Sequence, residues 1–327
     1  SMEGAAYEVG AIIDEKPKYI YPEDIKRQQI TMGASSYLKI GEGCNYQCGY
    51  CIIPKLRGKY ISRPIENIVK EANELADKGV TEIILIAQDT SSYGIDLYGK
   101  QALPQLLEEL NKIEKISWIR IMYAYPTQMT DELIDAIARL DKVVKYVDIP
   151  LQHSHPRVLE SMRRPVMNYT ELVNKIREKI PGVSVRTSLI VGYPGETEEE
   201  FEHLYSFVKN IRFDRMGAFE YSREKNTYSY SLKPQVPAKI KKSRREKLMK
   251  LQQQISLENN EKYIGSILKC IVEGYTDDEV IILRSEHDAP EIDGVVYATS
   301  ETPVVPGDIE EVKITRVDEY DLFGEIG

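Results

Sequence analysis

The sequence predicts an α/β fold in which a parallel β-sheet is followed by a small all-β barrel. Between Tyr37 and Tyr221, strand-like apolar segments alternate six times with helical patterns, and six successive βα units imply a parallel sheet. After Gly265 the chain changes to short alternating segments broken by glycine and proline. Its 327 residues, 42% of them hydrophobic and 29% charged, suffice for one large and one small domain without disulfides.

The strands of the sheet are predicted from apolar runs. Thr81–Ala87 contains four consecutive apolar residues, which is typical of a strand buried on both faces. The other five segments are Tyr37–Ile40, Ser117–Met122, Val143–Ile149, Val183–Val191 and Met216–Tyr221. Six units can form an open doubly wound sheet or a partly closed barrel. Both arrangements place ligands at the carboxyl ends of the strands.

Start and stop signals mark three of the helices between these strands. Ser62 and Gly79 bracket a pattern of apolar residues with helical spacing. Thr130 precedes another such pattern. Thr197, followed by three glutamates, predicts a capping box.

These patterns divide the chain into four parts. Residues 1–34 have little periodicity and are interpreted as a lead-in segment, and residues 35–237 form the α/β core. Residues 238–262 predict a polar linking helix that opens with the basic run Lys239–Lys250. Such a run can contact RNA, but we favour a solvated helix face because no aromatic residues interleave with it. Residues 263–327 form the small barrel.

The net charge of −9 is distributed unevenly. From Gly265 to Gly327 there are 16 acidic and 4 basic residues, a net charge of −12, whereas the rest of the chain carries +3. This asymmetry predicts that the two domains have different partners. No apolar run reaches the length of a membrane span, and three of the four cysteines crowd together, which together predict a cytoplasmic protein in a reducing compartment.

The cysteine cluster is the strongest chemical signal. Cys44, Cys48 and Cys51 form a Cx3Cx2C motif directly after the first strand. Closely spaced thiolates on one loop suit iron–sulfur ligation, and three ligands leave one iron of a [4Fe–4S] cluster open to a substrate. The alternative is a zinc site completed by His153 or His155.

The motif at this position resembles that of the radical S-adenosylmethionine (SAM) superfamily. The resemblance implies a partial (β/α)6 barrel and a [4Fe–4S] cluster whose open iron binds SAM. One electron then cleaves SAM and yields a 5′-deoxyadenosyl radical.

Other stretches resemble the radical SAM methylthiotransferase family, and the C-terminal segment resembles its TRAM barrel. They are IILIAQDTSSYG at Ile83–Gly94, DIPLQHSHPRVLESMRRP at Asp148–Pro165, VGYPGET at Val191–Thr197 and DAPEIDG at Asp288–Gly294. They are most similar to the members that methylthiolate the β-carbon of an aspartate in a small-subunit ribosomal protein. A tRNA adenosine methylthiotransferase is the alternative within the family, and a zinc-stabilised nucleic-acid-binding module is the alternative outside it.

The family also implies a second [4Fe–4S] cluster, held by three cysteines of an N-terminal domain. Those cysteines are not in this sequence, and Cys270 alone cannot replace them. The chemistry further requires a reducing electron donor.

Five residues are predicted to contact SAM. The resemblance places Tyr50 beside the adenine, and Gln88 and Asp89 near the methionine amine; a loop contact for Tyr50 and a helix cap for Asp89 are the alternatives. Arg186, within a strand, would bind the SAM carboxylate or form a structural ion pair. Gly192 would let the backbone approach the ligand closely.

The partner is predicted from charge. A barrel of net charge −12 should repel RNA, so tRNA is disfavoured, and it should attract a basic ribosomal protein. We expect the barrel to dock that protein near the mouth of the (β/α)6 core, through Asp277, Asp278, Glu279, Glu310 and Glu311.

Overall fold

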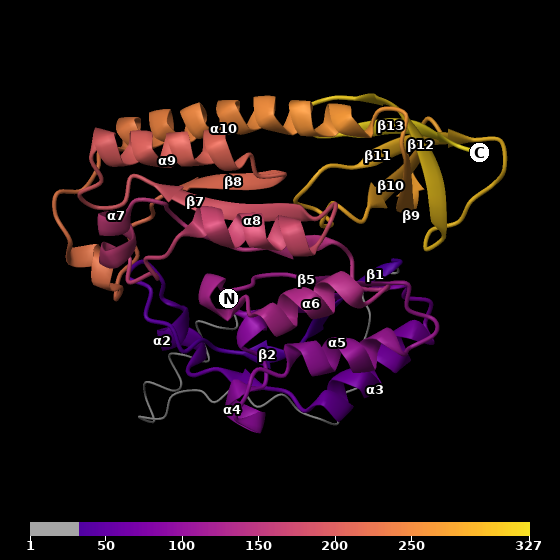
Figure 1. The fold of residues 1–327 in the computed structure, drawn as a ribbon, viewed down its shortest axis with the longest axis horizontal. Coiled ribbons are helices and arrows are strands. Elements are labelled where there is room, and N and C mark those ends of the chain that lie inside the picture. The colour runs from indigo at the N-terminus through magenta and orange to yellow at the C-terminus, as the bar shows by residue number, and fades with distance from the viewer. Residues whose placement is uncertain (1–32) are drawn as a thin grey trace.

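The computed structural model describes residues 33–327 and shows an elongated molecule with the (β/α)6 core at one end and the small barrel at the other (Figure 1). Six parallel strands form two three-stranded sheets, in the orders β1-β4-β5 and β6-β7-β8. A bridge between Ile119 and Val143 joins them. Their bounds are β1 Ser35–Lys39, β4 Glu82–Ile86, β5 Trp118–Ile121, β6 Tyr146–Asp148, β7 Ser184–Val191 and β8 Arg215–Glu220. The order of the strands in space follows their order in the chain. This confirms the prediction of a partial (β/α)6 barrel and excludes the alternative of a doubly wound sheet.

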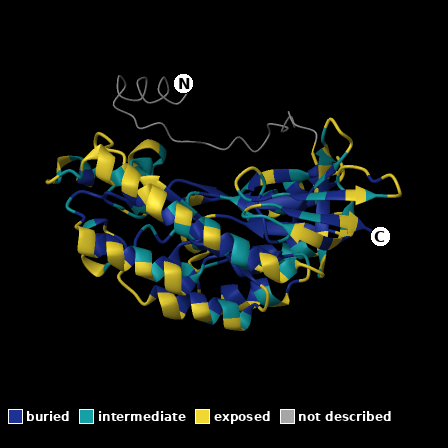
Figure 2. Cartoon of the chain, turned by 90° about the horizontal axis from the view of Figure 1, so that it is seen from above, coloured by how far each residue is buried: buried dark blue, intermediate teal, exposed yellow. Residues whose placement is uncertain are grey.

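Helices cover the outer face of this curved sheet. The longer ones are α3 Ile65–Ala76, α5 Leu103–Asn111, α6 Asp131–Arg139, α8 Tyr169–Lys179, α9 Glu198–Ile211 and α10 Ala238–Asn260. Shorter elements are α2 Ile53–Arg57, α4 Ile95–Tyr98, α7 Pro156–Ser161, and the 3-10 turns η1 Thr90–Ser92, η2 Pro126–Gln128, η3 Tyr228–Ser231 and η4 Glu261–Tyr263. Each longer helix keeps an exposed outer face while the strands between them are buried (Figure 2). Within residues 33–327 no helix is long and apolar enough to cross a membrane.

The helix signals were right at two sites and wrong at a third. Thr197 forms the predicted capping box with Glu200, and Thr130 caps α6 through the backbone N–H of Leu133. Ser62 does not start α3. It lies in β3 (Ile61–Ser62), which pairs with β2 (Gly41–Glu42), and its hydroxyl donates to Asp96 at 2.5 Å.

Residues after α10 form a closed five-stranded barrel in the order β10-β11-β13-β12-β9. The strands are β9 Ile267–Tyr275, β10 Ile281–Ser285, β11 Val296–Ser300, β12 Ile309–Val317 and β13 Leu322–Ile326. The alternating pattern of the sequence predicts four of them, at Ile267–Val272, Val280–Leu283, Val295–Ala298 and Val312–Val317. The alternating pattern of β13 is short and contains a glycine, so the sequence does not predict this strand.

The basic run at the start of α10 is not a purely solvated face. Arg244 is buried and forms an ion pair with Glu196 at 2.8 Å, and the Lys241 ammonium donates to the Tyr221 carbonyl at 2.8 Å. Lys239 and Lys242 are exposed, as predicted. The run therefore helps to fasten α10 to the core.

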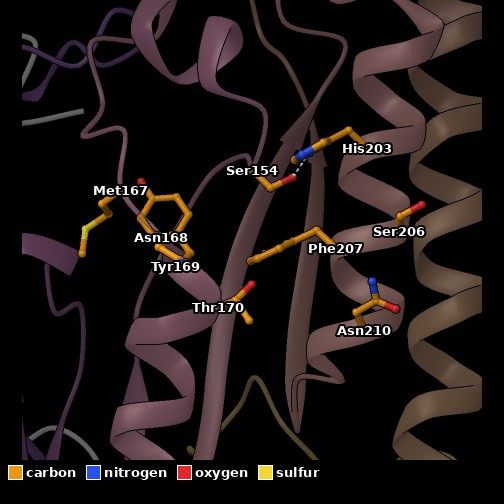
Figure 3. Close-up of a pocket in the computed structure, with 9 residues that line it drawn as sticks. All are labelled: Ser154, Met167, Asn168, Tyr169, Thr170, His203, Ser206, Phe207 and Asn210. Carbon is orange, nitrogen blue, oxygen red and sulfur yellow. Dashed lines mark hydrogen bonds between the residues drawn. The ribbon is translucent and has the colours of Figure 1, made fainter.

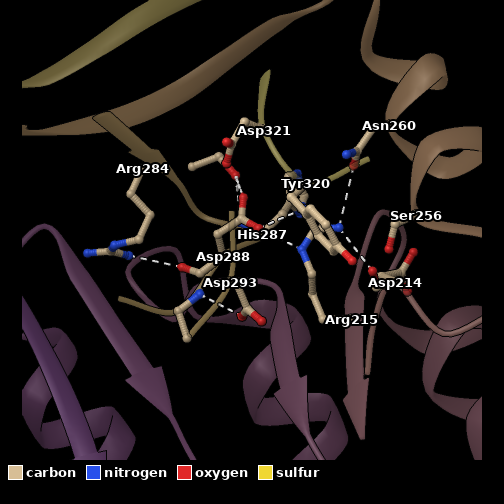
Figure 4. A network of polar contacts seen from close by, with 12 residues as sticks. Asp214, Arg215, Ser256, Asn260, Arg284, His287, Asp288, Asp293, Tyr320 and Asp321 are labelled. Carbon is tan, nitrogen blue, oxygen red and sulfur yellow. Dashed lines mark hydrogen bonds and ion pairs between the residues drawn. The ribbon is translucent and has the colours of Figure 1, made fainter. Parts of the chain in front are cut away.

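The small barrel closes the amino-terminal end of the (β/α)6 core. Arg284 reaches Glu82 at the start of β4 and donates to Ser35 at the start of β1. Asp288 pairs with Arg215 at the start of β8, and Figure 4 shows this network between the two domains. Ile271 and Ala289 of the barrel pack with Ile84, Trp118, Met122 and Tyr146 of the core.

This arrangement corrects the expected position of the acidic barrel and shows that part of its charge faces the core. Asp288 and Asp293 are buried against Arg215 and Arg186, so part of the charge asymmetry serves to join the domains and not to bind a partner. The barrel also lies at the amino ends of the strands, away from the loop that follows β1. The expectation that the barrel lies near the mouth of the core is therefore wrong.

Candidate functional site

A pocket of about 370 Å³ lies at the carboxyl ends of the core strands. Its lining comes from the loops after β1, β4, β5 and β6 and from Arg164, beyond α7. The residues are Cys44, Tyr46, Cys48, Tyr50, Cys51, Ile53, Ala87, Gln88, Asp89, Tyr123, Ala124, Tyr125, Pro150, Gln152 and Arg164. All three cysteines of the motif thus contribute to one cavity, at the end of the sheet where barrels of this type bind ligands.

Backbone hydrogen bonds hold the cysteine loop in place. The Cys44 amide donates to the Gly58 carbonyl at 3.1 Å, and the Cys51 amide to the Cys48 carbonyl at 3.0 Å. At the centre of the loop, the Gly49 amide donates to the Met162 carbonyl at 2.7 Å. A Cβ at Gly49 would lie 2.9 Å from the Tyr193 hydroxyl, so the loop lies too close to its neighbours there for a larger residue.

The local environment does not favour free thiolates. Burial, together with the neighbouring Cys48, Asp89 and Cys51 and against a backbone hydrogen bond from Tyr46, raises the pKa of the Cys44 thiol to about 11. Burial also raises the pKa of Cys51. These shifts favour the protonated thiol at Cys44 and Cys51, so iron would have to displace their protons, as expected where metal binding and deprotonation are coupled.

An aromatic and cationic wall faces the cysteines. The rings of Tyr46 and Tyr125 stack with centroids 3.6 Å apart and planes inclined by 8°. The Arg164 guanidinium lies over Tyr125, 4.2 Å from the ring centroid, and its Nη1 is 4.0 Å from Cys48 Sγ. Flat rings of this kind offer a face on which another ring system can stack.

The backbone is strained at this pocket. Tyr123 and Gln152 line it with φ angles of 62° and 74°, in the left-handed region that non-glycine residues seldom adopt. Their neighbours impose these angles: the Tyr123 amide donates to Asp148 at 3.1 Å, and the Gln152 amide to the Ser188 carbonyl at 2.9 Å. A strained backbone conformation persists only where the surrounding structure holds it in place, and residues with such conformations cluster at functional sites.

The site fits a cluster better than a zinc ion. His153 is fully buried, and its Nε2 lies 3.8 Å from Glu196; His155 lies 3.6 Å from Glu200. Neither histidine lines the pocket of the cysteines. Within residues 33–327 no three His, Cys, Asp or Glu side chains converge on one point. Zinc requires that convergence, whereas a cluster spreads its thiolates over separate irons.

The predicted SAM contacts divide into two groups. Tyr50, Gln88 and Asp89 line the pocket. Asp89, however, accepts from the backbone amides of Ser91 and Ser92, which is the predicted alternative of a helix cap. Gln88 Nε2 donates to Glu42 at 3.3 Å, while its buried Oε1 has no donor among the described residues.

Arg186 and Gly192 lie outside the lining of the pocket. Arg186 forms the predicted alternative of an ion pair, with Asp148 at 3.0 Å and Asp293 at 3.5 Å. Gly192 (φ 73°) brings its backbone close to α10, where a Cβ would lie 2.3 Å from Lys241 Cγ. Their contacts with SAM stay predictions.

Sequence reasoning did not assign roles to Tyr46, Tyr125 and Arg164. Tyr46 stands inside the cysteine motif, and Arg164 precedes Pro165 directly after a helical segment, so both carried a local signal. Tyr125 had none, because its partner lies 79 residues earlier and only the folded sheet brings the two rings together.

A second cavity, of about 430 Å³, lies between α8 and α9 (Figure 3). Its polar lining includes Ser154, whose hydroxyl is 3.0 Å from His203 Nδ1. No cysteine lines it.

Comparison with known proteins agrees with this geometry. The radical SAM superfamily matches residues 38–208, and the TRAM domain matches residues 264–326. A ribosomal protein uS12 methylthiotransferase RimO from Caldanaerobacter subterraneus is 53% identical over 94% of this chain and 71% of its own length. The RimO of Desulfitobacterium hafniense is 46% identical over 99% of this chain and 73% of its own.

A solved structure supports the fold. The coproporphyrinogen III oxidase HemN from Escherichia coli, a radical SAM enzyme, superposes with a TM-score of 0.52 at 16% identity, over 85% of this chain and 73% of that one. The sequence matches go further than the fold, because they cover nearly the whole chain and most of each relative. The chain therefore belongs to the radical SAM superfamily and, within it, to the methylthiotransferase family that includes the RimO proteins.

Proposed function

We propose that the chain is a methylthiotransferase that modifies the β-carbon of an aspartate in ribosomal protein uS12. The observation that carries this proposal is the match, over more than nine-tenths of the chain, to relatives named for that activity. The pocket supports it, because it combines three thiols, stacked rings and a buried cation at one end of the sheet. A one-electron reductant is required as a co-reactant.

Cys44, Cys48 and Cys51 would hold the [4Fe–4S] cluster, since their thiols line one pocket on a loop fastened by backbone hydrogen bonds. When bound, the cluster supplies the electron that breaks a carbon–sulfur bond of SAM and so provides the radical for hydrogen abstraction. The chain contributes binding, orientation and exclusion of water around that step.

Gln88 is better placed than Asp89 to orient the SAM amine. Its buried Oε1 has no hydrogen-bond donor among the described residues, and an ammonium group would supply one. Both Asp89 oxygens already accept hydrogen bonds from Ser91 or Ser92. The stacked Tyr46 and Tyr125 rings, together with Tyr50, provide apolar faces suited to the adenine.

The sharpest test follows the abstracted hydrogen. The anaerobically reconstituted chain is incubated with SAM, reductant and uS12 deuterated at the β-carbons of its aspartates, and the 5′-deoxyadenosine is analysed by mass spectrometry. We expect deuterium in 5′-deoxyadenosine. This step needs the radical but not the sulfur donor, so it does not depend on a second cluster. Unlabelled uS12 is the matched control.

Deuterated tRNA is tested in parallel. Deuterium transfer from tRNA and not from uS12 would replace the proposal with the tRNA-modifying alternative. Failure to produce any 5′-deoxyadenosine would instead count against the cluster and SAM assignment.

A further inference from the structure

Arg164 differs from the other buried arginines of residues 33–327. Four of them, Arg120, Arg215, Arg244 and Arg284, have a carboxylate oxygen within 4.0 Å. Arg164 is 8% exposed, yet no carboxylate of the described residues forms an ion pair with it, and its Nε has no hydrogen-bond partner. A buried guanidinium without a neutralising group is costly, so its surroundings should provide negative charge at some stage of the reaction.

The local fold holds this side chain in one position. Arg163, with φ 55°, lies two residues beyond the end of α7, and the Arg164 amide turns back to donate to the Leu159 carbonyl at 2.8 Å. The guanidinium then stacks on Tyr125 and donates through Nη2 to the Pro150 carbonyl at 2.5 Å. These contacts aim Nη1 at Cys48 Sγ, 4.0 Å away.

We propose that Arg164 is an electrostatic tuning residue that stabilises the reduced state of the cluster through the Cys48 thiolate. The inference rests on the cluster assignment and not on the identity of the substrate. Net charge, hydrogen bonds to the sulfur ligands and solvent exposure set the reduction potential of an iron–sulfur cluster. A fixed positive charge beside one ligand favours the state that carries one more electron, and burial keeps that charge from being screened by solvent.

The other possible anions are a carboxylate of SAM and one of the substrate. The geometry favours the thiolate, because Arg164 already lies within hydrogen-bonding distance of Cys48 sulfur while Tyr125 and Pro150 hold its remaining faces. The experiment separates these sources by leaving both SAM and substrate out.

The test is a redox titration of the reconstituted chain, followed by electron paramagnetic resonance of the reduced cluster. Arg164→Gln should lower the equilibrium constant for one-electron reduction about tenfold, which corresponds to about 59 mV. Arg164→Lys keeps the positive charge, so its reduction potential should lie closer to that of wild type. Arg163→Gln is the matched control. It removes the same charge from the neighbouring, exposed arginine, and should leave the potential unchanged.

Iron content and thermal unfolding are measured for every variant. Should Arg164→Gln fail to load iron, Arg164→Met replaces it, since an apolar chain of similar length can still pack on Tyr125. If a folded, iron-loaded variant that lacks the charge has the reduction potential of wild type, the inference is overturned. This holds also if such a variant binds SAM more weakly. A wild-type chain that binds no cluster would instead refute the cofactor assignment.

Discussion

Arg215, the first residue of β8, and Asp288, in the loop after β10, form an ion pair of 2.6 Å that is buried between the two domains. Arg120 and Glu82 form a second pair, 2.8 Å apart and fully buried, to which Arg284 adds a contact from the small barrel. These buried ion pairs therefore fix the TRAM barrel against the amino-terminal end of the core, so the two domains are not joined by a flexible linker alone.

Removing one member of the Arg215–Asp288 pair should destabilise the whole chain. Asp288→Asn leaves the Arg215 charge buried without its carboxylate, and breaking such a pair costs about 3–5 kcal/mol. Urea unfolding measures the loss. Asp277→Asn removes the same charge from an exposed turn and should change the free energy of unfolding by less than about 0.5 kcal/mol. Equal effects of the two substitutions would contradict the structural role of the pair.

Glu82 should make the free energy of unfolding depend on pH in the acidic range. Burial alone would raise its pKa, but the guanidiniums of Arg120 and Arg284 outweigh that effect and lower the pKa to about 2, from an ordinary value of 4.5. A depressed folded-state pKa stabilises the fold above pH 4.5, and that stabilisation is lost as the pH falls from 4.5 towards 2. The loss amounts to about 3 kcal/mol, from 1.36 kcal/mol per pKa unit.

The control for this dependence is Glu82→Gln, followed by urea unfolding between pH 7 and pH 2. The variant should be less stable at pH 7, because two arginines lose their charged partner, and its stability should fall less steeply below pH 4.5. A variant with the same acid profile as wild type would assign the dependence to other carboxylates.

Features carried by contiguous residues could be predicted, and features that join distant segments could not. The cysteine loop could be predicted because its three ligands lie within eight residues. The six strands could be predicted because each is a local apolar run. The sequence left the role of Arg186 undecided, since its partners Asp148 and Asp293 lie far from it in sequence, on the neighbouring strand and in the other domain. The same holds for Tyr125 and Arg164, whose places in the pocket depend on how the loops after β5 and α7 meet.

The three motif cysteines should be necessary for iron binding, and Cys270 should not. Two remaining thiolates are too few to hold a cluster, so alanine at Cys44, Cys48 or Cys51 should abolish iron binding. Cys270 is fully buried in the core of the TRAM barrel, where it packs as a small apolar residue. Iron and sulfide assays on the reconstituted chain should give about four irons for wild type and Cys270→Ala. The assignment is wrong if Cys270→Ala loses iron as fully as Cys48→Ala.

Two glycines of the cysteine loop offer a matched comparison. Gly43 and Gly58 both have positive φ, of 83° and 78°. A Cβ at Gly43 would lie 2.2 Å from the Lys59 carbonyl oxygen, whereas one at Gly58 would meet nothing within 4 Å. Gly58→Ala should therefore cost only the conformational strain of about 1–2 kcal/mol. Gly43→Ala should cost more and also displace Cys44, so we expect it to lose most of its iron. Equal iron contents in the two variants would show that the loop tolerates the displacement.

The acidic turn between β9 and β10 gives the last prediction. Asp277, Asp278 and Glu279 are exposed there and have no ion pair among the described residues, in contrast to the buried Asp288. Because none of them lines the pocket, they can speed the encounter with a basic protein without touching the reacting groups. Neutralising all three as Asp277→Asn, Asp278→Asn and Glu279→Gln should slow association of the full chain with uS12 by about tenfold at low salt. The difference should shrink as salt rises, because exposed charges are screened. Stopped-flow binding across a salt series measures both effects, with tRNA as the second ligand. tRNA should bind weakly to wild type. If tRNA instead binds tightly to wild type, and more tightly still to the neutralised variant, the acidic turn selects against RNA and does not recruit uS12.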